Sequence, residues 1–408
     1  MVKSLHPIGE ISSSIALESE RRVRLECRTE AVTVDDSRRL DAAQATIDAL
    51  AQPLEFPPLS AAIVPGDRVA IAVDEAVPRA ANIVHGVVES LCGAGIDSEA
   101  ISIVTRDAET SQICRTELAK QGQSSVKFIV HDPDDEKELC LVGVTQRHGP
   151  LVVNRAIFDA DVVLPIGCAR LDDAGVYDSL FPRFSNTETI QRFRAPLAVN
   201  TETSHAERVR ETDEAGWLIG APLVIEVVPG ADETVAHVIA GESQAVAQRA
   251  EELTRQQWIS HSDQRVSLVI AAITGGAPAQ NWNNVGRALA AAEQLVADDG
   301  AIAVCSNLDE PPGESLGRLI GSTDLADTER RLRQEHSDDS WAAWQLARAL
   351  DRGPVYFLSQ LDAETVEDMG MAPVADVEEL SRLAGRQASY IVLDDAQHAV
   401  PSVAGEDE

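Results

Sequence analysis

The stretch from Phe128 to Gly167, FIVHDPDDEKELCLVGVTQRHGPLVVNRAIFDADVVLPIG, decides the fold class of this chain. Its two ends contain short apolar runs, FIV and VVLPIG, that are typical of buried strands. Between them lie a Gly-Val-Thr turn, a Val-Asn-Arg step and an Ala-Asp pair that directly precedes the second run. Buried strands separated by such connections are typical of an α/β protein.

The same alternation is found upstream. The runs at 68–73 (RVAIAV) and 100–105 (AISIVT) predict buried strands, and the segments 80–95 and 111–122 predict helices. Strands joined by single helices imply right-handed crossovers and a parallel sheet. The first 60 residues are polar and weakly periodic, and within them only LDAAQATIDALAQ predicts a short helix.

The alternation restarts in the second half of the chain. VSLVIAAIT (266–274) and AIAVCSN (301–307) predict strands on either side of a helix at 282–300, and a helix at 242–259 is long enough to cross between domains. We therefore predict an α/β fold of two α/β domains with mainly parallel sheets and an interdomain cleft. The predicted divisions are an N-terminal extension (1–60), a first α/β domain (61–255), a C-terminal α/β domain (256–400) and a disordered tail (401–408).

The composition restricts the possible partners. The formal net charge is −33, so the chain would repel phosphate backbones and anionic membranes, and we expect no nucleic-acid or membrane partner. No run approaches the ~20 apolar residues of a membrane span. The first residues lack the apolar core of a signal peptide, which favours a cytoplasmic protein. The six cysteines include no CxxC pair and no Cys/His ligand spacing, so no metal ligand is predicted.

Common catalytic and nucleotide-binding motifs are absent. The chain contains no GxGxxG or P-loop after a strand, no HExxH and no GxSxG. Ligands of open α/β sheets lie at the carboxyl ends of strands. Asp74 is the first polar residue after RVAIAV, and it is either a turn-forming or helix-capping residue or part of a site.

Other polar residues follow the neighbouring predicted strands. Arg106 and Asp107 come after AISIVT, where they either form a solvated turn or face a site. Arg170, Asp172 and Asp173 come after the strand that ends at Gly167. This cluster either binds a ligand or forms salt bridges on the surface.

Several motifs together resemble the family of LarA-like, nickel-dependent lactate racemases. His131-Asp132, Gly143-Val144-Thr145, Asn154-Arg155 and Ala160-Asp161 are similar to steps of the family's N-terminal domain. In the family these are mostly fold-forming positions, so we expect His131 to be structural. The similarity covers about residues 60 to 310, and it identifies residues 61–255 as a LarA-like N-terminal domain. The resemblance implies an isomerase, a racemase or epimerase that acts on a small 2-hydroxy acid.

The residues that carry the family's chemistry are mostly replaced in this chain. Val77 stands where the family has an arginine that holds the substrate carboxylate, and Ala108 stands where a histidine moves a proton; alanine cannot exchange one. The family joins a nickel-pincer nucleotide to a lysine, but no lysine follows Lys137. Gln191-Arg192-Phe193-Arg194 stands where a nickel-binding histidine is expected. The cofactor is therefore left unknown.

Cationic and polar residues remain that suit a carboxylate ligand. Arg79 lies just beyond the proline of the Asp74 loop, and Asn284 and Arg287 correspond to a Gln-x-x-Lys step of the family. An arginine holds a carboxylate through two parallel hydrogen bonds, although Arg287 also fits an exposed first helical turn. The predicted substrate-binding residues are Arg79, Arg170, Asn284 and Arg287, and the catalytic candidates are Asp74, Arg106, Asp107, Asp172 and Asp173.

Two interpretations follow. In the first, the chain is a divergent lactate racemase-like enzyme that acts on or binds a small 2-hydroxy acid. In the second, it is an inactive descendant that keeps the fold and binds a small anion or a protein partner.

Overall fold

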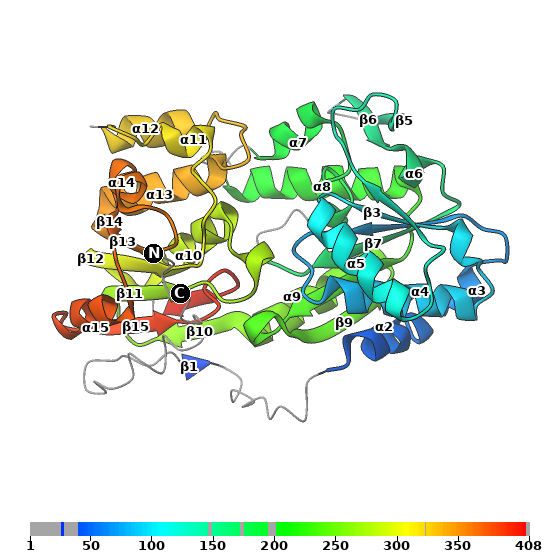
Figure 1. Cartoon of the computed structure of the whole chain (residues 1–408), viewed down its shortest axis with the longest axis horizontal. Coiled ribbons are helices and arrows are strands. Elements are labelled where there is room, and N and C mark those ends of the chain that lie inside the picture. Colours follow the sequence, from blue (N-terminus) through cyan, green and yellow to red (C-terminus); the bar gives the residue numbers. More distant parts are fainter. Residues whose placement is uncertain are drawn as a thin grey trace. The chain divides into compact units, whose positions relative to one another are not determined.

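The computed structural model describes residues 26–27, 40–145, 149–171, 175–194, 201–322 and 324–404. They fall into two compact units. Each unit contains a parallel or mainly parallel sheet with helices, which confirms the predicted α/β class (Figure 1). The N-terminal unit comprises Thr33–Phe193 and Val199–Arg255, and the C-terminal unit comprises Met1–Val32, Arg194–Ala198 and Gln256–Glu408.

The N-terminal unit contains a six-stranded sheet of order β4-β3-β2-β7-β8-β9. Every neighbouring pair is parallel except β8 and β9, which are antiparallel. Its strands are β2 (Val69–Val73), β3 (Ile101–Thr105), β4 (Lys127–Val130), β7 (Val162–Cys168), β8 (Val224–Pro229) and β9 (Val235–Gly241).

The continuous apolar run of β2 is explained by burial on both faces of this sheet. Ile71 and Val73 belong to one core cluster, whereas Ala70 and Ala72 belong to another. Successive side chains of a strand point to opposite faces, so a strand covered on both sides shows no polar alternation.

Different helices cover the two faces. Residues of α2 (Ala42–Ala51), α4 (Ala80–Gly93) and α5 (Ala108–Lys120) share the core cluster of Ile71. Residues of α6 (Arg155–Phe158), α8 (Thr201–Ile219) and α9 (Ser243–Trp258) belong to the cluster of Ala70. The unit also contains α3 (Leu59–Ala62), α7 (Thr187–Arg194) and the antiparallel hairpin of β5 (Leu139–Thr145) and β6 (Gly149–Asn154).

The C-terminal unit contains a parallel five-stranded sheet of order β14-β13-β12-β11-β15 and a smaller sheet of order β1-β10-β16. The strands of the larger sheet are β11 (Val266–Ala272), β12 (Val296–Cys305), β13 (Val355–Leu358), β14 (Ala372–Pro373) and β15 (Tyr390–Leu393). Those of the smaller sheet are β1 (Glu26–Cys27), β10 (Ile259–Ser262) and β16 (Val400–Val403). The helices are α10 (Trp282–Leu295), α11 (Glu314–Gly317), α12 (Leu325–Leu332), α13 (Ser340–Arg352), α14 (Ala363–Asp368) and α15 (Val377–Gly385).

Three local predictions were wrong. Residues 143–145 are not a turn but the end of β5, where they pair with 149–151 across the hairpin. The helix predicted at 282–300 ends at Leu295, because Val296 starts β12 by pairing with Val266. Residues 401–403, predicted to be part of a disordered tail, lie in β16, since their backbone pairs in parallel with β10.

Among the described residues, no helix combines the length and apolarity that a bilayer crossing requires. The cytoplasmic location, the interdomain cleft and the absence of a nucleic-acid partner stay predictions.

Candidate functional site

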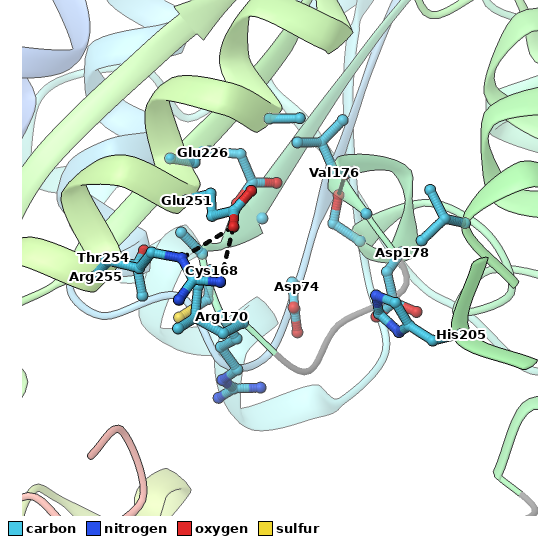
Figure 2. Close-up of a pocket in the computed structure, with 18 residues that line it drawn as sticks. Asp74, Cys168, Arg170, Val176, Asp178, His205, Glu226, Glu251, Thr254 and Arg255 are labelled. Carbon is cyan, nitrogen blue, oxygen red and sulfur yellow. Dashed lines mark hydrogen bonds and ion pairs between the residues drawn. The ribbon is translucent and has the colours of Figure 1, made fainter. Parts of the chain in front are cut away.

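A pocket lies at the carboxyl edge of the six-stranded sheet. The chain passes from β2 to β3 on one side, while β7 pairs with β2 on the other, so the strand order reverses between β2 and β7. Open α/β sheets bind ligands at such a reversal. The cavity has a volume of about 330 Å³. Its ionisable lining residues are Asp74, Cys168, Arg170, Asp178, His205, Glu226, Glu251 and Arg255 (Figure 2).

Asp74 directly follows β2 and is 1% exposed. Its backbone N–H donates to the carbonyl of Ile166 on β7 (3.0 Å). Its Oδ1 accepts the N–H of Ala76 (3.0 Å). These bonds join the ends of the two strands and fix the carboxylate at the pocket wall.

A mostly buried guanidinium, Arg183, links two carboxylates of the pocket. Its Nη1 lies 3.5 Å from Oδ1 of Asp74, and its Nη2 lies 2.8 Å from Oδ2 of Asp178. Burial by itself would raise the pKa of Asp74, but the positive charges of Arg183 and Arg170 outweigh burial and lower this pKa below its ordinary value. Asp74 is therefore ionised at neutral pH.

Glu226 is a charged residue in the middle of an otherwise apolar buried strand, β8, and is 4% exposed. It lies beside Gly167 of β7 in the register of the sheet. A Cβ on Gly167 would lie 2.3 Å from Oε1 of Glu226, so the carboxyl group occupies the space that a side chain on β7 would fill. Glycine at 167 thus allows Glu226 to extend over β7 and to line the pocket.

The remaining polar residues come from helices and from the segment Val176–Ser179. Glu251 and Arg255 lie one turn apart on α9 and form an ion pair of 2.9 Å. In Figure 2 they lie on the same side as Glu226, whereas Asp178 and His205 lie together on the other side. The pocket therefore combines guanidinium groups, which suit a carboxylate, with carboxyl and imidazole groups, which suit hydrogen-bond donors and proton exchange.

The structure brings three of the predicted residues to this site. Asp74 and Arg170 both line the pocket. Arg106 does not line it, but its Nη1 forms a 3.1 Å ion pair with Glu75, next to Asp74, and its charge contributes to the lowered pKa of Asp74. Asp74 also forms the turn that was its alternative interpretation, because its Oδ1 accepts the N–H of Ala76.

The other predicted residues lie elsewhere. Asp107 caps α5 by accepting the N–H of Thr110 (2.6 Å), and Arg79 is exposed at the start of α4 in a left-handed conformation (φ 54°). Neither lines the pocket. Asp172 and Asp173 lie outside the described residues.

Asn284 and Arg287 belong to the first turns of α10 in the C-terminal unit. The Asn284 amide donates to the carbonyl of Ala279 (2.8 Å), and Arg287 lies over the ring of Trp341 at 6.0 Å. Arg287 is half-buried rather than exposed, and its stacking on an aromatic ring gives it a packing role.

His131 has the structural environment that was expected. Its Nε2 is 2.8 Å from the carbonyl oxygen of Ser185, and its Nδ1 is 3.2 Å from the amide nitrogen of Asn154. Burial lowers the pKa of His131. The imidazole thus connects the end of β4 to the end of β6 and to the segment that follows β7.

Sequence reasoning missed Arg183, Asp178, Glu226, Glu251 and Arg255. One of them left a signal, because Glu226 is the only charged residue in the apolar stretch PLVIEVVPG. A carboxylate in a strand buried on both faces is costly and is often retained for function. The other four lie in ordinary polar segments and offer no such signal.

Comparison with known proteins identifies the relatives of this arrangement. Residues 10–193 match the model of the lactate racemase N-terminal domain. This part of the chain is lactate racemase-like. The chain is 23% identical over 287 residues to a lactate racemase of Thermoanaerobacterium thermosaccharolyticum. The aligned region covers 65% of this chain and 67% of that protein.

Two solved structures share the fold. The lactate racemase apoprotein of the same organism has a TM-score of 0.69 at 19% identity and covers 89% of this chain and 93% of its own. A protein of Thermotoga maritima has a TM-score of 0.68 at 13% identity, and the match covers 90% of this chain and 99% of that protein. Both matches show the two-domain α/β fold, and at these identities they show the fold alone.

The nickel-pincer nucleotide implied by the resemblance does not fit the residues of this chain. The segment that follows β7, from Ala169 to Arg194, contains no lysine, and no lysine occurs after Lys137. Over the residues that the structure describes, no group of three or more His, Cys, Asp or Glu side chains is arranged to hold a metal ion. Val77 packs in the core, and Ala108 begins α5. The lysine, arginine and histidine that the resemblance implies are therefore absent from these positions of the sequence.

Proposed function

We propose that this lactate racemase-like protein binds a small 2-substituted carboxylic acid, of the 2-hydroxy acid type, in the pocket at the ends of β2 and β7. The observation that carries the proposal is the position of Arg170, which lines the cavity two residues after the end of β7. A guanidinium binds a carboxylate through paired, charge-assisted hydrogen bonds. The charge of Arg170 also helps to lower the pKa of Asp74, which lines the same cavity.

The other guanidiniums at or near the site form ion pairs with neighbouring carboxylates. Arg255 is already held by Glu251 at 2.9 Å. Arg183 is held by Asp178 at 2.8 Å and is not among the lining residues. The 2-substituent of the ligand then faces the carboxyl and imidazole groups of the same cavity.

Isomerisation of the bound acid is the second candidate function. His205 lines the pocket, and its imidazole is the side chain best suited to exchange a proton near neutral pH. The chain has no lysine after Lys137, so it lacks the lysine that the resemblance implies for a nickel cofactor.

Binding of D- and L-lactate and of larger 2-hydroxy acids, followed by calorimetry, tests the first proposal. Charge-assisted hydrogen bonds contribute about 1.5–3 kcal/mol, so R170M should weaken binding roughly 10- to 100-fold. R249M is the matched control, because Arg249 lies on α9, pairs with Glu252 at 2.6 Å and does not line the pocket. Equal affinities of R170M and the unmodified protein would refute the proposal. Incubation of one enantiomer followed by chiral chromatography tests isomerisation, which H205N should abolish.

A further inference from the structure

Two arginine–aspartate pairs connect the ends of β2 and β7, at opposite edges of the sheet. At the amino edge, Arg68 directly precedes β2, and its Nε lies 3.1 Å from Oδ2 of Asp161, which directly precedes β7. At the carboxyl edge, Oδ1 of Asp74 lies 3.5 Å from Nη1 of Arg183, in the segment that follows β7. The first pair is exposed, whereas the second is mostly buried beside the pocket. A comparison of the two arginines therefore separates an effect on the pocket from an effect on the joining of the strands.

Arg183 contacts two walls of the pocket without lining the cavity itself. Besides its contact with Asp74, its Nη2 lies 2.8 Å from Oδ2 of Asp178, and its Nε donates to the carbonyl oxygen of Asp178 (3.1 Å). Asp178 belongs to the short 3-10 helix Val176–Ser179, which also contributes Val176 and Ser179 to the lining. Arg183 therefore acts on a bound ligand through carboxylates that line the cavity.

Asp74 lies in the middle of this acid-lined cavity. In Figure 2 it lies between the side formed by Glu226 and Glu251 and the side formed by Asp178 and His205. An uncompensated carboxylate at this place would repel an anionic ligand, because charges interact strongly at the low effective dielectric constant of a mostly buried site. Binding of a carboxylic acid beside Asp74 therefore requires that the charge of Asp74 is compensated.

Three guanidiniums act on Asp74, and Arg183 has the largest effect. Their charges lower the pKa of Asp74 in the order Arg183, Arg170 and Arg106. Arg106 lies 3.1 Å from Glu75, so part of its charge is offset by that carboxylate, which also lies 3.9 Å from Arg183. Arg170 has to serve the ligand as well under the proposed function. Arg183 is therefore the main counter-charge of Asp74 outside the cavity lining.

We infer that Arg183 is a positioning residue of this pocket, which holds and neutralises Asp74 so that an anionic carboxylic acid can bind beside it. This inference rests on the proposed binding of a 2-hydroxy acid, and it names the residue that makes an acid-lined cavity able to accept an anion. Arg183 acts through its charge on Asp74 and makes no contact with the ligand. A lysine at this position would supply the same charge, although without the two-pronged geometry of a guanidinium.

Calorimetry on the full chain tests the inference, with D-lactate, L-lactate and 2-hydroxy-4-methylpentanoate as ligands. At about pH 7, R183M should weaken binding roughly tenfold, because the charge of Asp74 is then poorly compensated. R183K keeps the charge and should weaken binding by less than roughly threefold. R68M is the matched control, because Arg68 joins the same two strands at the opposite edge of the sheet and does not line the pocket. Its affinity should equal that of the unmodified protein.

Two further measurements separate the charge of Arg183 from a merely structural role. Loss of Arg183 raises the pKa of Asp74, so more of Asp74 is protonated at about pH 5 and the ratio of the two affinities should shrink there. His205 titrates in both proteins, so its effect cancels in this ratio. In the D74N background no charge needs compensation, and R183M should change the affinity little.

The outcomes separate this inference from the proposed function. If binding depends on Arg170 but is unchanged in R183M, the inference is overturned and the proposed function stands. A loss in R183M that is equal at both pH values, or that persists in the D74N background, shows a structural role and also overturns it. If R183M does not fold, R183K decides, since a tenfold loss in that variant contradicts a role of charge. If no 2-hydroxy acid binds, the proposed function fails, and the inference fails with it.

Discussion

Replacing Arg183 by methionine should destabilise the N-terminal unit, and it should do so most strongly at neutral pH. Asp74 is 1% exposed, and Arg183 ion-pairs with it (3.5 Å) as well as with Asp178 (2.8 Å). Removing one partner of a buried ion pair costs about 3–5 kcal/mol. Asp74 would still accept the hydrogen bond from the N–H of Ala76 and would still be stabilised by the charge of Arg170. We therefore expect a loss at the lower end of that range, about 3 kcal/mol.

The pH dependence follows from the pKa of Asp74. In the unmodified protein this folded-state pKa is lowered, so Asp74 contributes stability above its unfolded-state pKa and loses it as the pH falls through the folded-state value. Burial raises the pKa of Asp74, whereas the arginine charges lower it, and burial is the largest single influence on this pKa. Without Arg183, burial should raise the pKa above its ordinary value, and the unit then loses stability as the pH rises through that raised value. The difference between the two proteins should therefore shrink as the pH falls.

Hydrogen exchange measured by mass spectrometry, corrected for intrinsic exchange rates, reports this stability unit by unit. Protection of peptides from β2 and β7 gives the effect of R183M at about pH 7 and about pH 5. R106M is the control, because Arg106 pairs with the exposed Glu75 and should cost less than about 1 kcal/mol. An equal loss of protection at both pH values, or no loss, would refute the reasoning about Asp74.

Two further predictions concern packing and thiol reactivity. Gly167→Ala should lower the free energy of unfolding by about 1–3 kcal/mol and displace the carboxyl group of Glu226, since the added Cβ would lie 2.3 Å from Oε1. Gly93→Ala is the control, because Gly93 is at the end of α4 and nothing lies within 4 Å of the added Cβ. In urea unfolding this variant should be neutral or slightly more stable. Burial raises the pKa of Cys114 to about 12, so iodoacetamide at about pH 8 should leave Cys114 unlabelled in the folded protein, while the half-buried Cys140 is labelled. Mass spectrometry of the peptides decides this, and rapid labelling of Cys114 would contradict its burial.

The α/β class was predictable because local patterns carry it. Runs such as RVAIAV show no polar alternation, which indicates strands covered on both faces, and the helices between them imply parallel pairing. The resemblance to lactate racemases was also visible in the sequence, from short motifs around His131 and Asn154. Boundaries were less predictable, as at Leu295 and Val296, because pairing with a distant strand overrides local helix propensity.

The sequence by itself determined the strand-and-helix alternation, the place of Asp74 and Arg170 at strand ends, and the absence of any lysine after Lys137. These are properties of single positions or short segments. Only the tertiary structure decided which charges meet. Arg183 reaches Asp74 across 109 positions of sequence, and Glu226 reaches the pocket over Gly167 because β7 and β8 pair in one register. Such contacts depend on the relative placement of distant strands, and no local pattern records that placement.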